Sequence, residues 1–179
     1  MSELFQKEKN FEKSIEILKK ALSKHPEEYI VVTDQLINVY LSDNRIAEAK
    51  STLNEAITKN PKNSQYYYVI SSLYDSEKEF ETVEKNLLKA LELKLDYIEA
   101  ANNLAILYYN QAIIVNKSLN GITDNMLYKA EKDKVEVLFK KSIPYFEKVR
   151  VAMPNDVQTK ENLKFLYSRY AMTEKLNSL

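Results

Sequence analysis

The sequence repeats itself with a period of about 34 residues, and this period constrains the fold more than any other feature. One column of the repeat is aromatic, and its members are separated by 35, 34, 34 and 59 residues: Phe5, Tyr40, Tyr74, Tyr108 and Tyr167. Four further columns, which start at Met1, Leu18, Ala21 and Pro26, step through the chain with the corresponding spacings. A unit of this size cannot bury enough apolar surface to be stable alone, so we expect neighbouring units to stack on one another.

Each period contains apolar residues at the spacing of two amphipathic helices. Ile70, Leu73 and Tyr74 fit the first helix of one unit, and Val83 and Leu87 fit its second helix. Polar segments separate these stretches, at 42–44 and 75–77 within units and at 60–64 between units. The pattern therefore predicts an all-α chain with two helices in each unit.

The units at 30–63 and 64–97 resemble the tetratricopeptide repeat, a helix-turn-helix unit of about 34 residues. The second of them carries Tyr67, Ile70, Ser71, Tyr74, Leu87 and Ala90 at pattern positions, and departs from the pattern at Val83 and Leu95. The resemblance implies a single domain over 1–179, a right-handed superhelical solenoid of antiparallel helix pairs with about 4.5 repeats. The expected units are 1–29 (partial), 30–63, 64–97, 98–156 and 157–179 (partial).

The fourth unit contains an insertion, because the last step of each column exceeds the 34-residue period by 25 residues. All 25 lie between Tyr108 and Phe146, and apolar spacing continues through them. We expect an elongated helical hairpin whose extension covers 109–141, with a helix stop at Asn120-Gly121, a new helix start at Thr123 or Asp124, and a bend at Pro144. Two interpretations stay open: the hairpin is an additional contact surface, or it is an insertion that packs on itself.

In the tetratricopeptide family the first helices line a concave groove that binds an extended peptide or a partner helix. The residues of this sequence at those positions are the candidate binding residues: Asp34, Asn38, Tyr68, Ser72, Asn102, Asn103, Tyr109, Asn162, Phe165 and Arg169. Neighbouring groove positions hold Gln35, Gln65, Asp75, Glu99, Ile106, Asn110 and Glu161. The family's clamp for a terminal carboxylate is missing, since Arg169 is the single cation in this set. A neutral or basic polypeptide segment is therefore favoured, although the asparagines could be no more than solvated helix surface.

Charge and composition disfavour other functions. The 26 basic and 26 acidic residues give no net charge, so we expect no nucleic-acid partner. No apolar run approaches the length of about 18 residues that a membrane span needs, so we expect no membrane insertion. With one histidine, His25 at a helix end, and no cysteine, we expect no metal, no cofactor and no enzymatic activity. In the run Tyr66-Tyr67-Tyr68, we expect Tyr67 to belong to the core.

A second interpretation of function is structural, in which exposed terminal repeats self-associate or dock onto further repeats. The register places the start of the first unit about six residues before Met1, so we expect either a piece of a longer repeat protein or a chain that starts on a frayed helix. The segments 104–110, 140–148 and 163–172 resemble a bacterial subset of the family, many of whose members are exported across the inner membrane. The compartment stays open: periplasmic if the chain is such a piece, otherwise cytoplasmic.

Overall fold

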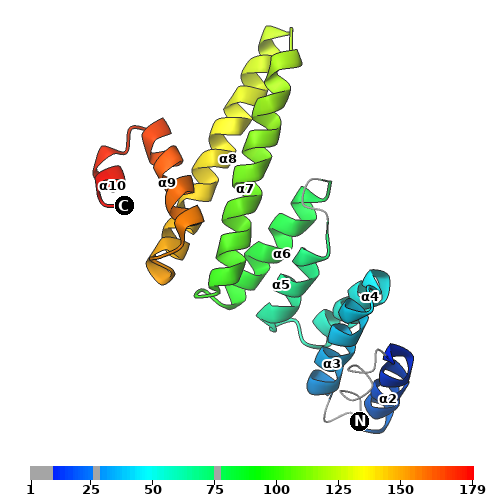
Figure 1. Ribbon diagram of the computed structural model, residues 1–179. Helices are drawn as coiled ribbons and strands as arrows, with labels where there is room; N and C mark the ends of the chain where they lie inside the picture. The colour runs from blue at the N-terminus through cyan, green and yellow to red at the C-terminus, as the bar shows by residue number, and fades with distance from the viewer. Residues whose placement is uncertain (1–9, 26–28, 75–77) are drawn as a thin grey trace. The chain divides into compact units, whose positions relative to one another are not determined.

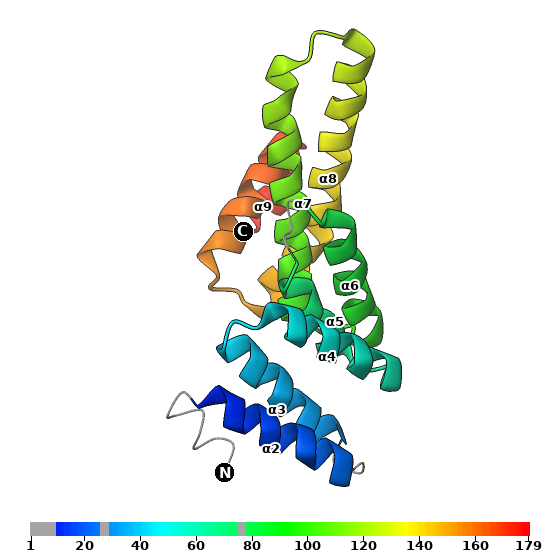
Figure 2. The same ribbon diagram turned by 90° about the vertical axis from the view of Figure 1, so that its right-hand side faces the viewer.

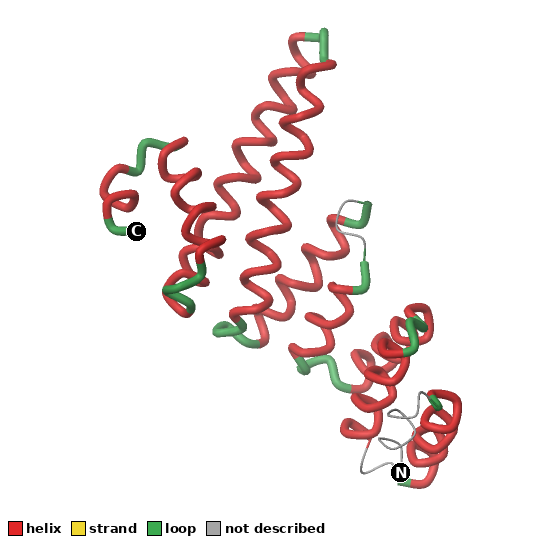
Figure 3. The backbone as a smooth tube through the Cα atoms, in the orientation of Figure 1, coloured by secondary structure: helices red, strands yellow, loops and turns green. Residues whose placement is uncertain are grey.

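The computed structural model describes residues 10–25, 29–74 and 78–179, and all regular structure in these ranges is helical (Figure 3). The positions of Met1, Phe5, Pro26 and Asp75 in the repeat lie outside the described residues. The chain divides into two compact units, residues 1–73 and 74–179, which are described separately below. The prediction of an all-α chain built from helix pairs is confirmed.

The first unit consists of four described helices, α2 (Phe11–Lys24), α3 (Tyr29–Ser42), α4 (Ile46–Lys59) and α5 (Ser64–Ser72). Its core is formed by residues of α2, α3 and α4, among them Leu18, Leu36, Tyr40 and Ala49. Ala49 is completely buried, and its small side chain lets the neighbouring helix backbones approach closely. The breaks between helices fall at the polar segments that the sequence indicated, and the Asn63 side chain caps α5 by accepting a hydrogen bond from Gln65 N.

The second unit consists of α6 (Phe80–Leu93), α7 (Ile98–Ser118), a 3₁₀ turn (Leu119–Gly121), α8 (Asn125–Ala152), α9 (Val157–Arg169) and α10 (Thr173–Asn177). The helices α7 and α8 run side by side in opposite directions and extend beyond the ends of α6 and α9 (Figures 1 and 2). They form the predicted elongated hairpin. Its turn begins after Ser118, and Asp124 caps α8 by accepting a hydrogen bond from Leu127 N. Pro144 lies within α8, which continues as one helix on both sides of it.

The columns of the sequence repeat form the cores of both units. The Leu36 column is buried throughout its described members, with Ile70, Leu104 and Leu163 exposed by 2% or less. Leu53, Leu87 and Phe146 of a second column are equally buried. One expectation within a unit is wrong: Tyr67 is only half-buried and donates its hydroxyl hydrogen to Pro61 O, whereas its neighbour Tyr66 is 2% exposed. Tyr66 lies four residues before the buried Ile70 and so shares its helix face, which places Tyr66 in the core while Tyr67 lies at its edge.

Candidate functional site

In the first unit, the candidate residues lie on α3 and α5. Asp34, Asn38 and Ser72 are exposed, and Tyr68 is half-buried. Partial burial raises the pKa of Asp34, and the pKa of Tyr66 rises to about 12 because of burial and the nearby Asp34 carboxylate. The Tyr66 hydroxyl makes no hydrogen bond of good geometry within the described part of the chain. The structure therefore places Asp34 beside a buried tyrosine of the next helix pair, on a mainly polar surface.

In the second unit, an aromatic cluster joins α7, α8 and α9. It consists of Tyr109, Phe139, Phe146 and Phe165. The Tyr109 ring packs edge-on at 5.4 Å from Phe139, 6.0 Å from Phe146 and 5.9 Å from Phe165, between ring centroids. Phe139 and Phe146 are 1% exposed, whereas Phe165 is 41% exposed. Two predicted groove residues, the half-buried Tyr109 and the exposed Phe165, are thus brought into contact.

Amide side chains flank this cluster. Asn102 and Asn103 are half-buried on α7, and Ile106, one turn further along the same helix, is 36% exposed. Asn162 on α9 is only 9% exposed, and its Oδ1 accepts a hydrogen bond from Gln158 Nε2 at 3.1 Å. The asparagines are therefore more enclosed than freely solvated surface positions.

Arg169 is not an unpaired cation. Its guanidinium forms an ion pair with Glu136 of α8 and lies 5.1 Å from the centre of the Phe139 ring. The Tyr170 hydroxyl donates to the other Glu136 oxygen at 2.6 Å. The hydrogen bond from Arg169, together with that from Tyr170, lowers the pKa of Glu136 despite its partial burial. Glu136 could not be expected from the repeat pattern, because it belongs to the inserted segment, which has no counterpart in the other repeats.

The described residues show no catalytic arrangement of metal ligands: nowhere in these ranges do three His, Asp or Glu side chains converge in a way that could hold a metal ion. In the same ranges, no helix has the length and apolar character needed to cross a membrane. His25 ends α2, where its backbone N–H donates to Ala21 O at 2.9 Å.

Several solved structures share this architecture. The crystal structure of MamA is 16% identical, with a TM-score of 0.61 over 99% of this chain and 89% of that one. A tetratricopeptide repeat protein from Parabacteroides merdae is 19% identical, with a TM-score of 0.55 over 99% of this chain and 73% of that one. A TPR repeats protein from Bacteroides fragilis is also 19% identical, with a TM-score of 0.57 over 94% and 80% of the two chains. At these identities the likeness concerns the fold alone.

Sequence comparison identifies the repeat directly. One tetratricopeptide repeat family model matches residues 5–73, and another matches residues 64–97. A search of curated proteins finds no matching sequence. The two family models together span more than half of the 179 residues, and the buried columns described above are those that the repeat requires. The chain therefore belongs to the tetratricopeptide repeat family.

Proposed function

We propose that this protein binds a neutral or basic polypeptide segment on one face of its second unit, formed by Asn102, Asn103, Ile106, Tyr109, Asn162 and Phe165. We call this the α7/α9 face. The tetratricopeptide fold is in general a scaffold for protein–protein interaction and not an enzyme. The observation that supports a binding role for this face is the 5.9 Å contact between Tyr109 and Phe165, which anchors a 41% exposed aromatic ring on a rigid base.

The chemistry of the α7/α9 face suits a polypeptide. Ile106 and Phe165 offer apolar surface to a partner side chain. The amides of Asn102 and Asn103 both donate and accept hydrogen bonds, as a peptide backbone requires. Aromatic residues held by their neighbours lose little conformational entropy on binding, and this favours them as anchors.

Charge supports a neutral or basic partner. The positive charge of Arg169 is offset by Glu136, so it offers little to an acidic segment. Glu99 and Glu161 are exposed on α7 and α9 and would attract a basic residue at the edge of the face. In the first unit, the exposed Asp34 adds negative charge to the candidate positions there.

A peptide-display selection on the full chain tests the proposal. A random library of twelve-residue peptides is selected against the protein, and the peptides recovered are measured by fluorescence anisotropy. We expect apolar sequences with zero or positive net charge and affinities near micromolar, or about −8 kcal/mol. Predominantly acidic peptides would contradict the charge assignment.

Matched variants locate the site. Ile106→Ser and Asn103→Ala should each weaken peptide binding about fivefold to tenfold, because each removes one contact and leaves the aromatic cluster intact. Tyr109→Ala is a poorer choice, since it would open a cavity in that cluster. Val151→Ser is the control, because Val151 is 85% exposed on α8 and lies outside the face. Equal binding by all three variants would show that the α7/α9 face is not the site.

The second interpretation, self-association through terminal repeats, is tested by measuring the mass of the full chain in solution. Sedimentation across a hundredfold range of concentration should give the mass of one chain if the protein acts as a scaffold for other polypeptides. A mass that rises with concentration, together with no selected peptides, would favour the structural role.

A further inference from the structure

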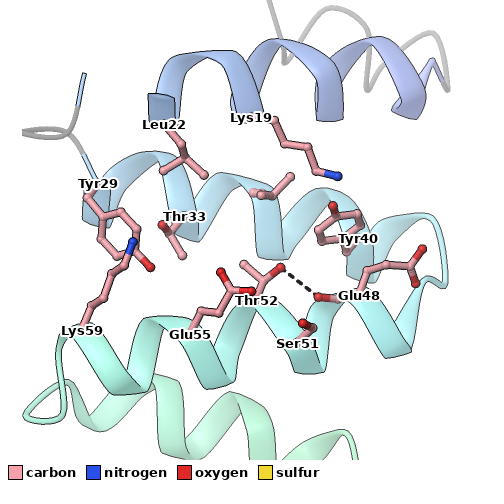
Figure 4. A pocket seen from close by; sticks show the side chains of 11 residues that line it. Lys19, Leu22, Tyr29, Thr33, Tyr40, Glu48, Ser51, Thr52, Glu55 and Lys59 are labelled. Carbon is pink, nitrogen blue, oxygen red and sulfur yellow. Dashed lines mark hydrogen bonds between the residues drawn. The ribbon is translucent and has the colours of Figure 1, made fainter. Parts of the chain in front are cut away.

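A cleft of about 360 Å³ opens in the first unit between α2 and α4, with α3 as its floor (Figure 4). The floor residues Tyr29, Thr33, Leu36 and Tyr40 follow the helical spacing of one stripe of α3. None of the candidate groove residues lines this cleft. It is therefore a separate feature from the surface that the sequence analysis singled out.

The floor of the cleft carries an unsatisfied hydroxyl group. Thr33 is 1% exposed, and within the described residues its Oγ1 has no hydrogen-bond partner. Other helical hydroxyls of this protein donate to a carbonyl of the preceding turn, as Thr52 does to Glu48 O and Thr58 to Asn54 O, at 2.8 and 2.9 Å. A buried polar group without a partner is costly, and such groups commonly mark the place of a water or ligand. Figure 4 shows Thr33 between Leu22 and the α4 wall.

A tyrosine with a cation over its ring lies at each end of the cleft (Figure 4). Lys59 Nζ lies 4.0 Å from the centre of the Tyr29 ring, and the Arg45 guanidinium lies 5.2 Å from that of Tyr40. Arg45 also binds Glu48, with Nε and Oε1 2.7 Å apart. The charges of Lys59, Arg45 and Glu48 are therefore engaged with neighbouring side chains at the ends of the cleft.

Two opposite charges lie on its walls. Lys19 lines the cleft from α2 and Glu55 lines it from α4 (Figure 4). Neither side chain forms an ion pair within 4.0 Å in the described ranges, although Lys19 interacts with Glu48 over a longer distance. Leu22 and Leu36 supply apolar surface in the same cleft.

We propose that this cleft binds a free amino acid with an apolar side chain. The ligand's ammonium group faces Glu55, its carboxylate faces Lys19, and its side chain packs on Leu22 and Leu36. A ligand of one charge would meet a like charge on one of the two walls, whereas a zwitterion satisfies both. At roughly 30 Å³ for each water of the bulk liquid, the cleft has room for such a solute.

Calorimetric titration of the full chain with L-leucine, leucinamide and N-acetyl-leucine tests the chemistry. Leucinamide stands for the first residue of a polypeptide and N-acetyl-leucine for the last, so the three probes also separate a free amino acid from a chain end. We expect leucine to bind with a dissociation constant of a few millimolar or tighter, and both capped compounds to bind at least tenfold more weakly. No binding of leucine, or equal binding of a capped compound, would overturn the proposal.

Variants locate the ligand within the cleft. Glu55→Gln and Lys19→Gln should each weaken leucine binding about tenfold, whereas Glu16→Gln and Lys20→Gln, exposed on α2 outside the cleft, should leave it unchanged. Thr33→Val should raise the melting temperature of the free protein, because it removes an unsatisfied buried hydroxyl. Unchanged leucine affinity in Glu55→Gln and Lys19→Gln would place the ligand elsewhere. Ile106→Ser, which weakens peptide binding under the proposed function, should not affect leucine.

Discussion

The Tyr108 hydroxyl donates a hydrogen bond of 2.5 Å to Glu84 Oε1, and so joins α7 to α6 within the second unit. Lys141 Nζ of α8 lies 3.1 Å from the same carboxylate oxygen and 5.0 Å from the centre of the Tyr108 ring. One carboxylate, one tyrosine and one cation therefore connect three successive helices. The tyrosine is 2% exposed, so burial and the hydrogen bond to Glu84 raise its pKa strongly.

The same three chemical groups recur at two other described members of the aromatic column. In the second unit the groups are Glu147 of α8, Tyr167 of α9 and Lys175 of α10. In the first unit they are Glu12 of α2, Tyr40 of α3 and Arg45, the residue that precedes α4. At Tyr167 the hydroxyl bonds to the carboxylate, at 2.9 Å, whereas at Tyr40 the carboxylate binds the cation above the ring. A tyrosine at this column therefore contacts charged side chains of neighbouring segments in addition to packing in the core.

Tyr108→Phe should lower the free energy of unfolding by about 1–2 kcal/mol, because it removes a hydrogen bond to a charged group without changing the packing of the ring. Urea denaturation followed by circular dichroism measures this. Glu84→Gln and the double variant complete a mutant cycle, in which we expect a coupling of about 1 kcal/mol. Tyr128→Phe is the control, since Tyr128 is 40% exposed near the hairpin end. If both tyrosine variants lose the same stability, the bond to Glu84 is not what stabilises the contact.

Stability should fall at alkaline pH. Burial, together with the nearby carboxylates of Asp34 and Glu136, raises the pKa of Tyr66 and of Tyr170 from the ordinary 10.0 to about 12. The unfolded chain releases these protons near pH 10 and the folded chain near pH 12. The stabilisation is therefore complete below pH 10 and is lost as the pH rises from 10 to 12.

Urea midpoints measured from pH 9 to 12 test this expectation. Tyr170→Phe should flatten the decline, because the variant has no phenolic proton to lose at that position. Tyr128→Phe should keep the steep decline of the parent protein. Parallel pH profiles in all three proteins would contradict a role for the buried hydroxyls.

The repeat period predicted most of this fold because it reports which residues must be buried together. One column of the repeat consists of Leu36, Ile70, Leu104 and Leu163. All four are buried, as expected of equivalent positions in successive repeats. The hairpin was also predictable, since the apolar spacing continues through the 25 extra residues.

The remaining features are contacts between helices whose positions do not recur from one repeat to the next, so the repeat period could not predict them. The pairing of Arg169 with Glu136 depends on where the inserted α8 passes α9, and the sequence contains no second example of that contact. The cleft around Thr33 depends on the separation of α2 and α4. Tyr66 and Tyr67 lie four and three residues before the buried Ile70, and helical spacing allows either ring to lie on its face, so the sequence alone could not assign Tyr66 to the core.

Asp156 should contribute about 1 kcal/mol as the cap of α9. Its Oδ2 accepts a hydrogen bond of 2.8 Å from Thr159 N, and the hydrogen bonds from the Thr159 hydroxyl and backbone lower the pKa of Asp156. Asp156→Ala should reduce the unfolding free energy by about 1 kcal/mol at neutral pH, whereas Asp156→Asn should retain most of it.

The effect of Asp156→Ala should also depend on pH in a defined direction. A carboxylate with a lowered pKa stabilises the fold above its unfolded pKa, and this contribution disappears as the pH falls through the folded value. The difference between the parent protein and Asp156→Ala should therefore narrow in acid, as measured by urea denaturation between pH 7 and 3. A difference that stays constant would show that the cap acts without its charge.

Gly121→Ala should stabilise the hairpin, although glycine at a turn usually serves a backbone conformation that other residues avoid. Gly121 does not adopt a positive φ, and a Cβ atom added there would meet nothing within 4 Å. Alanine therefore costs nothing in the folded hairpin and reduces the entropy of the unfolded chain, a gain of about 0.4–1 kcal/mol. Thermal denaturation measures the gain, with Asn120→Ala as the neighbouring control that leaves the glycine in place.

Because the turn lies at the end of the hairpin, hydrogen exchange of the amides around 115–128 should slow in Gly121→Ala even where global unfolding changes little. Faster exchange there would mean that the turn needs a conformation that only glycine adopts easily.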